Sequence, residues 1–222
     1  LKVVVDGGNG VGSDLAVEIL SRMGVEVIAQ FCDPDPTFPN HHPDPSVEAN
    51  MLLLRERVLK EKADFGVGLD GDADRMAVMD ENGRILYGDE LLSLFARELL
   101  ARKPGSTVMG EVKCSHLMYK DIEDHGGKPL MWITGHSIIK AKMQEVGAAL
   151  AGEVSGHMFF NDGWFGFDDA IYGSARFASI FSQQNKPLSQ LPGWAKTAKT
   201  PEIHVACPDA IKFDVVNKAR EY

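Results

Sequence analysis

Short apolar runs and stretches of helical periodicity alternate along most of the chain. The first run, KVVVD at 2–6, is followed by a glycine turn and then by apolar positions that fall on one helix face. The same order recurs, and such alternation predicts mixed or parallel sheets covered by helices. We expect strands at 2–6, 25–29, 64–69, 76–80, 84–87, 107–112, 129–132 and 148–152, and helices at 13–23, 46–62, 89–102, 115–124, 137–146 and 168–183.

Side chains that can cap a helix stand at the start of three of these helical segments. Ser13, Ser46 and Asp89 can each accept a hydrogen bond from an N–H group of the first turn, as N-cap residues do. We therefore expect these three residues as N-caps.

The tripeptide Lys103-Pro104-Gly105 divides the pattern in two. Proline and glycine end the preceding helix, and the strand and helix pattern then starts again. The sequence predicts an α/β protein with two consecutive domains, 1–102 and 103–200, each a mixed sheet flanked by helices. The last segment, 201–222, reads as a strand followed by a helix after Pro208, so we expect a linker and the start of a further domain there.

Composition narrows the class of protein. The 222 residues are 44% hydrophobic and carry a net charge of −9, which allows a buried core and argues against a nucleic-acid partner. Cys32, Cys114 and Cys207 form no CxxC pair, so we expect neither disulfides nor a zinc site, and a cytoplasmic location. No apolar run approaches the roughly 18 residues needed to span a bilayer, so we expect no membrane partner. Because the sequence starts at Leu1 inside a strand, we expect it to be part of a longer protein.

Three aspartates stand at alternate positions in DGDADR, 70–75, between two predicted strands. In one tight turn, with the carboxylates of Asp70, Asp72 and Asp74 about 4 Å apart, each pair would repel by about 1 kcal/mol in water and by about 4 kcal/mol at an effective dielectric of about 20. A bound cation reverses that effect, and oxygen-only ligands favour Mg²⁺. Arg75 adds a guanidinium suited to a phosphate or a phosphosugar.

This turn has two alternative interpretations. A turn rich in Asp and Gly can be a solvated loop, but the third aspartate and the adjoining arginine argue against that. The spacing of Asp70, Asp72, Asp74 and Glu81 also matches ligand positions of an EF-hand. The EF-hand needs glycine at its sixth position, where Arg75 stands, and helices rather than strands on both sides.

A second group of polar residues lies in GEVSGH, 152–157, after an apolar strand. If this segment is extended, Glu153, Ser155 and His157 point to one side and could bond sugar hydroxyls while the imidazole exchanges a proton. A glycine-containing turn with a capping glutamate is the alternative. Two nearby features support a binding site: His136 opens a helix where an anion could bind, and Lys113 ends a strand. Each could equally be an ordinary polar surface residue.

The glycine turn at 7–12 follows a strand and opens a helix, as a dinucleotide-binding turn does. Its register is wrong, because the third glycine of that fingerprint falls on Ser13, and the lysine of a P-loop is absent. We interpret it as a tight structural turn, and His41-His42 as part of a proline-rich loop.

Three motifs in this order, DGDADR at 70–75, TGHS at 134–137 and GEVSGH at 152–157, resemble those of the α-D-phosphohexomutases, and most closely those of the bacterial phosphomannomutase/phosphoglucomutase group. The resemblance covers nearly the whole chain, including FPNHHPDP at 38–45 and WFGFDD at 164–169. It implies that the chain corresponds to the second and third domains, and the start of the fourth, of a four-domain enzyme.

The resemblance also implies roles for individual residues. Asp70, Asp72 and Asp74 would bind Mg²⁺, and Arg75 would reach into the cleft. A further set would hold the phosphosugar, with Glu153 and Ser155 at the ring hydroxyls and His157 in proton transfer or hydroxyl orientation; its members are Lys113, His136, Glu153, Ser155 and His157. Ala73 stands where many members carry Gly, and we expect an ordinary backbone conformation there, because a positive φ would cost alanine about 1 kcal/mol.

The activity implied for the full-length protein is reversible phosphoryl transfer between hexose 1-phosphate and hexose 6-phosphate, of mannose, glucose or both, through a phosphoserine and a hexose 1,6-bisphosphate. We expect that phosphoserine in a domain outside this sequence. Ser155 does not replace it, because its surroundings match the sugar-binding loop. The chain alone is then expected to be inactive and to need the other domains of its own protein. Two alternatives stay open: a Mg²⁺-dependent phosphatase with an aspartate nucleophile, and, for the chain alone, a non-catalytic phosphosugar-binding module.

Overall fold

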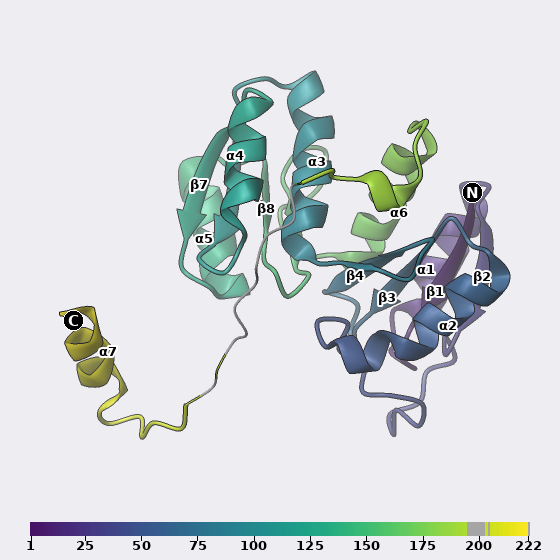
Figure 1. The fold of residues 1–222 in the computed structure, drawn as a ribbon, viewed down its shortest axis with the longest axis horizontal. Coiled ribbons are helices and arrows are strands. Elements are labelled where there is room, and N and C mark those ends of the chain that lie inside the picture. The colour runs from purple at the N-terminus through teal and green to yellow at the C-terminus, as the bar shows by residue number, and fades with distance from the viewer. Residues whose placement is uncertain (195–202, 204, 222) are drawn as a thin grey trace.

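The computed structural model describes residues 1–194, 203 and 205–221. Two α/β units lie side by side, and helix α3 stands between them (Figure 1). Each unit has its own sheet, and both sheets combine parallel with antiparallel neighbours. The predicted architecture of two mixed sheets flanked by helices is therefore confirmed.

The first sheet has five strands in the order β2-β1-β3-β4-β5. Strand β1 is parallel to both β2 and β3, whereas β4 is antiparallel to its two neighbours. Helix α1 lies on one face and α2 on the other. The bounds of these elements are β1 Lys2–Asp6, α1 Ser13–Arg22, β2 Glu26–Gln30, a 3-10 helix η1 Glu48–Met51, α2 Leu52–Glu61, β3 Phe65–Leu69, β4 Met76–Asp80 and β5 Ile85–Leu86.

The second sheet repeats the plan with four strands in the order β7-β6-β8-β9. Strand β6 is parallel to β7 and β8, and β9 runs antiparallel at the edge. Helix α4 packs on one face and α5 on the other. The bounds are β6 Thr107–Glu111, α4 His116–Asp124, β7 Lys128–Trp132, α5 His136–Val146, β8 Leu150–Gly152 and β9 Met158–Phe160.

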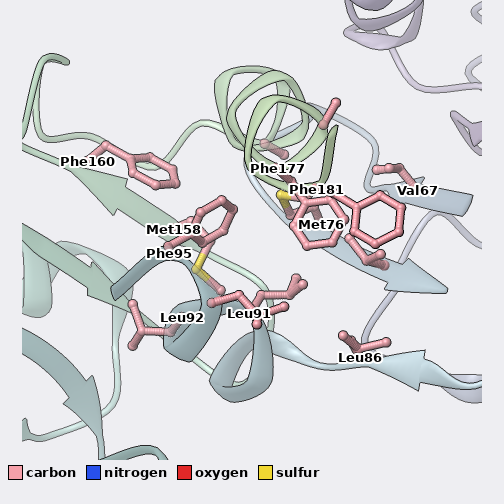
Figure 2. Packing of buried hydrophobic residues seen from close by; sticks show 14 of the residues in the cluster. Val67, Met76, Leu86, Leu91, Leu92, Phe95, Met158, Phe160, Phe177 and Phe181 are labelled. Atoms are coloured by element: carbon pink, nitrogen blue, oxygen red, sulfur yellow. The ribbon is translucent and has the colours of Figure 1, made fainter. Parts of the chain in front are cut away.

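One hydrophobic core extends through both units. Helix α3, Gly88–Arg102, packs against α4 and β8 on one side and against β4, β5 and α6, Ala170–Ser182, on the other. Phe95 of α3 meets Phe160 of β9 edge to face at 5.0 Å and lies 6.2 Å from Phe177 of α6, as Figure 2 shows. Edge-to-face aromatic pairs of this kind add about 1 kcal/mol each to burial. The proposed division into domains at residues 102 and 103 stays a prediction, and the buried side chains are continuous across it.

All three predicted N-caps are wrong, because each side chain has another partner. The Ser13 hydroxyl donates to the carbonyls of Gly7 and Gly10, so it closes the preceding turn. Ser46 donates to Asp44, and its helix starts only at η1. In α3 the N-cap position is held by Tyr87, and Asp89 lies within the first turn, where its carboxylate accepts from Ser115 N–H in the next unit.

Two more differences concern the end of the chain and the second sheet. Strand β9 was not predicted, because its three residues are too few to show a period. The predicted strand near residue 201 falls mostly on residues outside the described ones, and the helix predicted after Pro208 is α7, Lys212–Arg220. A second 3-10 helix, η2, spans Leu188–Gln190. Among the described residues, no helix combines the length and apolarity needed to cross a bilayer.

Candidate functional site

The acidic turn connects the antiparallel strands β3 and β4. One carboxylate oxygen from each of Asp70, Asp72 and Asp74 lies within 4.8 Å of the other two. Asp70 is buried and organises the turn, because its Oδ1 accepts the backbone N–H groups of Asp74 and Arg75, both at 3.1 Å. Asp72 is exposed. The structure therefore brings together the three carboxylates that the sequence analysis selected.

The protein offsets the negative charge of this cluster only in part, through the Arg75 guanidinium at Asp70. Burial and the neighbouring carboxylates of Asp70 and Asp72 raise the pKa of Asp74 to about 6, although the nearby His157 acts in the opposite direction. Three converging oxygen donors on a two-strand turn suit a hard cation such as Mg²⁺, which takes few protein ligands. The residues present thus fit a divalent metal ion.

The backbone at Ala73 differs from our expectation. Its φ is +60°, in the left-handed region, although the residue is an alanine and is 5% exposed. The conformation reverses the chain inside the turn, where Ala73 N–H donates to the carbonyl of Asp70 at 3.3 Å and Ala73 C=O accepts from Ala170 N–H at 3.0 Å. Those two bonds, one within the turn and one to the start of α6, hold an alanine in a conformation that usually needs glycine.

Arg75 lies beside the acidic turn, as predicted, but its guanidinium is anchored by carboxylates. Nε donates to Asp70 Oδ2 at 2.8 Å, and Nη1 donates to Asp44 Oδ1 at 3.1 Å. Although burial opposes its charge, these partners raise the pKa of Arg75, so it stays protonated. Asp44 was missed by the sequence analysis, because it lies 31 residues before Arg75 in the proline-rich loop.

The second polar group lies on the hairpin between β8 and β9. We expected an extended segment, and the structure shows a turn in which Glu153 N–H donates to the carbonyl of His157 and Gly156 N–H donates back to that of Glu153. The turn still brings the three predicted side chains together. His157 Nδ1 lies 3.0 Å from both Glu153 Oε2 and Ser155 Oγ. The alternative of a glycine-containing turn describes the backbone correctly, and the side chains converge nonetheless.

Glu153 connects this hairpin to the start of α5. Its Oε1 accepts the N–H of Gly135 at 2.8 Å, so the chain's own carboxylate lies at the helix start where the sequence suggested an anion. Burial alone would raise the pKa of Glu153, but its bonds with His157 and Gly135 lower it. Burial likewise opposes the charged form of His157, but Glu153 and Asp74 raise its pKa above the ordinary value. The pair therefore favours a charged carboxylate and a protonated imidazole.

His136 lies against His157 at the first residue of α5. The two rings stack with centroids 5.2 Å apart, and His136 Nδ1 lies 2.9 Å from Asp168 Oδ2. Lys140, one helix turn further along α5, donates to the other oxygen of Asp168 at 3.0 Å. Neither Lys140 nor Asp168 was predicted as a site residue from the sequence. The i, i+4 spacing from His136 could have indicated Lys140, whereas Asp168 lies 32 residues away and gives no local signal.

The two polar groups meet across the boundary between the sheets. His157 Nε2 lies 3.5 Å from Asp74 Oδ1, and the backbones of Arg75 and His157 pair in an antiparallel bridge. Met76 N–H donates to the carbonyl of Gly156 at 3.2 Å. Gly156 has φ +104°, and a Cβ there would lie 2.3 Å from the Met76 carbonyl oxygen, so only glycine allows this approach.

Glu111, the last residue of β6, bonds the turn that carries Lys113. Its buried carboxylate accepts from Lys113 N–H and from Thr134 Oγ, both at 2.7 Å, and from Val154 N–H at 3.4 Å. Glu111 therefore connects the end of β6, the segment before α5 and the β8–β9 hairpin. The structure places the backbone of Lys113 in this group, and the role of its ammonium group stays a prediction.

Comparison with known proteins places these motifs in a family. Residues 1–83 match the family description "Phosphoglucomutase/phosphomannomutase, alpha/beta/alpha domain II", and residues 87–196 match domain III of the same family. A phosphomannomutase/phosphoglucomutase from Pseudomonas aeruginosa is 44% identical over 217 residues, which is 97% of this chain and 47% of that protein. A phosphoglucomutase from Neisseria meningitidis serogroup A is 44% identical over 209 residues, or 94% of this chain and 45% of that protein.

The fold agrees with a solved structure. A phosphoglucomutase/phosphomannomutase family protein from Burkholderia thailandensis superposes with a TM-score of 0.87 at 44% identity, over 90% of this chain and 44% of that one. The chain thus spans about half the length of the relatives it matches.

Proposed function

The chain belongs to the phosphoglucomutase/phosphomannomutase family, and from that premise we propose that the full-length protein interconverts hexose 1-phosphates and hexose 6-phosphates, of mannose, glucose or both, by phosphoryl transfer. The observation that carries the proposal is the 3.5 Å approach of His157 to Asp74, which puts the acidic turn of one unit beside the Glu153 and Ser155 group of the other. Phosphoryl transfer depends mainly on positioning and on charge neutralisation, and this arrangement offers both.

Asp70, Asp72 and Asp74 would hold Mg²⁺ at the turn, since their oxygens converge and a bound cation would relieve their mutual repulsion. The bound ion would neutralise charge on the phosphoryl group. Arg75 has five N–H donors, and within the described part of the chain Asp70 and Asp44 accept from two of its side-chain nitrogens. Its remaining donors would bind phosphate oxygens next to the turn.

The hairpin and the start of α5 would hold the sugar. Glu153 and Ser155 would bond ring hydroxyls, and His157, whose pKa its carboxylate neighbours raise, would donate a hydrogen bond or a proton at the hydroxyl being released. His136, held by Asp168, and Lys113 in the turn after β6 would bind the phosphate that is not transferred.

The phosphoryl donor would be a phosphoserine in a part of the full-length protein outside these 222 residues. The phosphoryl group would pass from that serine to a free hydroxyl of the hexose monophosphate to give a hexose 1,6-bisphosphate, and the other phosphoryl group would return to the serine. Hexose phosphates, the bisphosphate and the remaining domains of the protein are thus the proposed partners, in the cytoplasm.

The test is a parallel assay of the full-length protein with mannose 1-phosphate and glucose 1-phosphate, Mg²⁺ and catalytic hexose 1,6-bisphosphate. We expect 6-phosphates to form with negligible release of inorganic phosphate. Glu153→Gln should raise KM and lower kcat, because it removes a charged bond to a hydroxyl and to His157, whereas Glu145→Gln on the exposed part of α5 should leave both unchanged.

Two results would contradict the proposal. Stoichiometric release of inorganic phosphate with an aspartyl-phosphate at the acidic turn would indicate a phosphatase. Sustained mutase turnover by the 222-residue chain alone would contradict a phosphoserine located elsewhere.

A further inference from the structure

The glycine turn at 7–12 has no part in the proposed chemistry, yet it lies directly against the acidic turn. Val11 N–H donates to the carbonyl of Gly71 at 3.0 Å. A Cβ at Gly10 would lie 2.7 Å from the Gly71 carbonyl oxygen and 2.8 Å from that of Asp70. The two backbones are therefore in contact, and the acidic turn packs against the glycine turn.

At the end of the glycine turn, Gly12 lies opposite Ala73. Gly12 has φ −91° and ψ −4°, an ordinary conformation that any residue can adopt, so its backbone does not require glycine. A Cβ built on Gly12 would lie only 2.4 Å from the Cβ of Ala73, and 3.3 Å from Ile171 Cδ1 of α6. Ala73, in contrast, has φ +60°, where glycine is favoured. The glycine and the alanine are thus reversed relative to what the two backbones alone prefer.

We propose that Gly12 and Ala73 are a positioning pair, in which the single β-carbon of Ala73 fills the contact between the glycine turn and the acidic turn and so fixes where Asp72 and Asp74 lie. This inference rests on the proposed function, because it concerns the turn that would hold the metal. The constraint is steric, because the contact between residues 12 and 73 has room for one β-carbon, on either residue, and not for two.

Ala73 is well placed for this role, since it stands between two of the three carboxylates. Its N–H is bonded to Asp70 and its carbonyl to Ala170, so the residue is held within the turn, by α6 and by Gly12. It is also buried, at 5% exposure. A second β-carbon at residue 12 would have to push Ala73 away by about 1 Å to reach ordinary contact distance, and the carboxylates on both sides would move with it.

The single variant Gly12→Ala should therefore weaken metal binding. Changes in residues that orient metal ligands typically cost about tenfold or more in affinity, and we expect a loss of that size. The exchange Gly12→Ala with Ala73→Gly puts the β-carbon on the ordinary backbone and glycine on the left-handed one. It should restore the affinity to within about threefold of the wild type, because the two changes are strongly coupled. Ala73→Gly alone leaves the contact unfilled and should give an intermediate loss.

The experiment measures binding of Mn²⁺ alone, from the electron paramagnetic resonance signal of the free ion, in the full-length protein and these three variants. Thermal unfolding in EDTA is recorded in parallel. Gly127→Ala is the matched control, because its Cβ would lie 2.8 Å from Ile122 Cγ2 and Leu100 Cδ1. Gly127 directly precedes β7, at the opposite end of the second sheet from Glu111. This variant should lower the melting temperature and leave Mn²⁺ affinity unchanged.

An affinity loss in Gly12→Ala that the exchange recovers supports the pair, and so does a Gly12→Ala protein that folds only when Ala73→Gly is added. Wild-type affinity in Gly12→Ala, or an exchange variant that binds no better than Gly12→Ala, overturns it. If the wild type binds no Mn²⁺, the proposed metal site fails on its own. The melting temperatures then decide the steric pair, through whether the exchange recovers what Gly12→Ala lost.

Discussion

Replacing Asp72 with Asn should change stability in opposite directions with and without metal. The carboxylate of Asp72 lies within 4.8 Å of those of Asp70 and Asp74, and its side chain is exposed. At the dielectric of water, each of these two repulsions amounts to about 0.9 kcal/mol at that distance, and physiological salt reduces their sum to about 1 kcal/mol. Without metal, Asp72→Asn should therefore raise the free energy of unfolding by up to about 1 kcal/mol.

With metal the order reverses. A ligand at about 100 times its Kd stabilises the folded state by about 2.7 kcal/mol. The wild type should gain that amount from Mg²⁺, and Asp72→Asn, with one ligand lost, should gain much less. The full-length variant should also lose mutase activity while its fold is unchanged.

The assay is equilibrium urea unfolding of the full-length protein in EDTA and at increasing Mg²⁺. Asp33→Asn, at an exposed loop aspartate outside the cluster, is the control and should behave as the wild type in both conditions. A variant that is less stable than the wild type in EDTA would mean that Asp72 holds the turn together rather than strains it. An undiminished gain from Mg²⁺ would remove Asp72 from the metal site.

Three further outcomes are expected. Burial would raise the pKa of Asp162, but its basic neighbours hold it at about 2, against 3.8 in the unfolded chain, so this carboxylate stabilises the fold by about 2 kcal/mol above pH 4 and the contribution is lost as pH falls to 2. In urea unfolding from pH 7 to pH 2, the free energy of unfolding should therefore fall less steeply with acid for Asp162→Asn than for the wild type. An equal fall in both proteins would contradict this. Gly156→Ala should lower both the melting temperature and kcat, because its Cβ collides with the Met76 carbonyl; a wild-type melting curve would show that the hairpin can move away at no cost. Burial raises the pKa of Cys32 to about 11 and that of Cys114 further, so native iodoacetamide labelling at pH 8, read by peptide mass spectrometry, should spare both, and labelling within minutes would refute it.

The fold could be predicted from the sequence where hydrophobic periodicity is strong. Most strand and helix positions follow from it, because the buried faces of these elements have to be apolar. The caps could not be predicted in this way, since Ser13 has a choice of nearby partners and the geometry of the turn decides between them. Strand β9 exists because β8 offers it an edge, which its three residues do not reveal.

For the candidate site, the motifs selected the residues that converge, but not how they converge. The extended alternation assumed for Glu153 to His157 was wrong, because Gly156 allows the hairpin to fold tightly against β4. The prediction of an ordinary backbone conformation at Ala73 was also wrong, since that conformation depends on bonds to residues far away in the sequence, such as Ala170. Asp44 and Asp168 were missed for the same reason.

The continuous core around Phe95 limits how this protein can be recombined with its relatives. An exchange of residues 1–83 for the matching segment of a relative would replace Met76 and leave Phe160 and Phe177, which belong to the same buried cluster, to pack against a foreign surface. It would also pair a foreign acidic turn with the native hairpin across a single backbone bridge. Chimeras should therefore tolerate crossovers poorly anywhere between β1 and α6, and a productive graft would carry both sheets together as a single cassette.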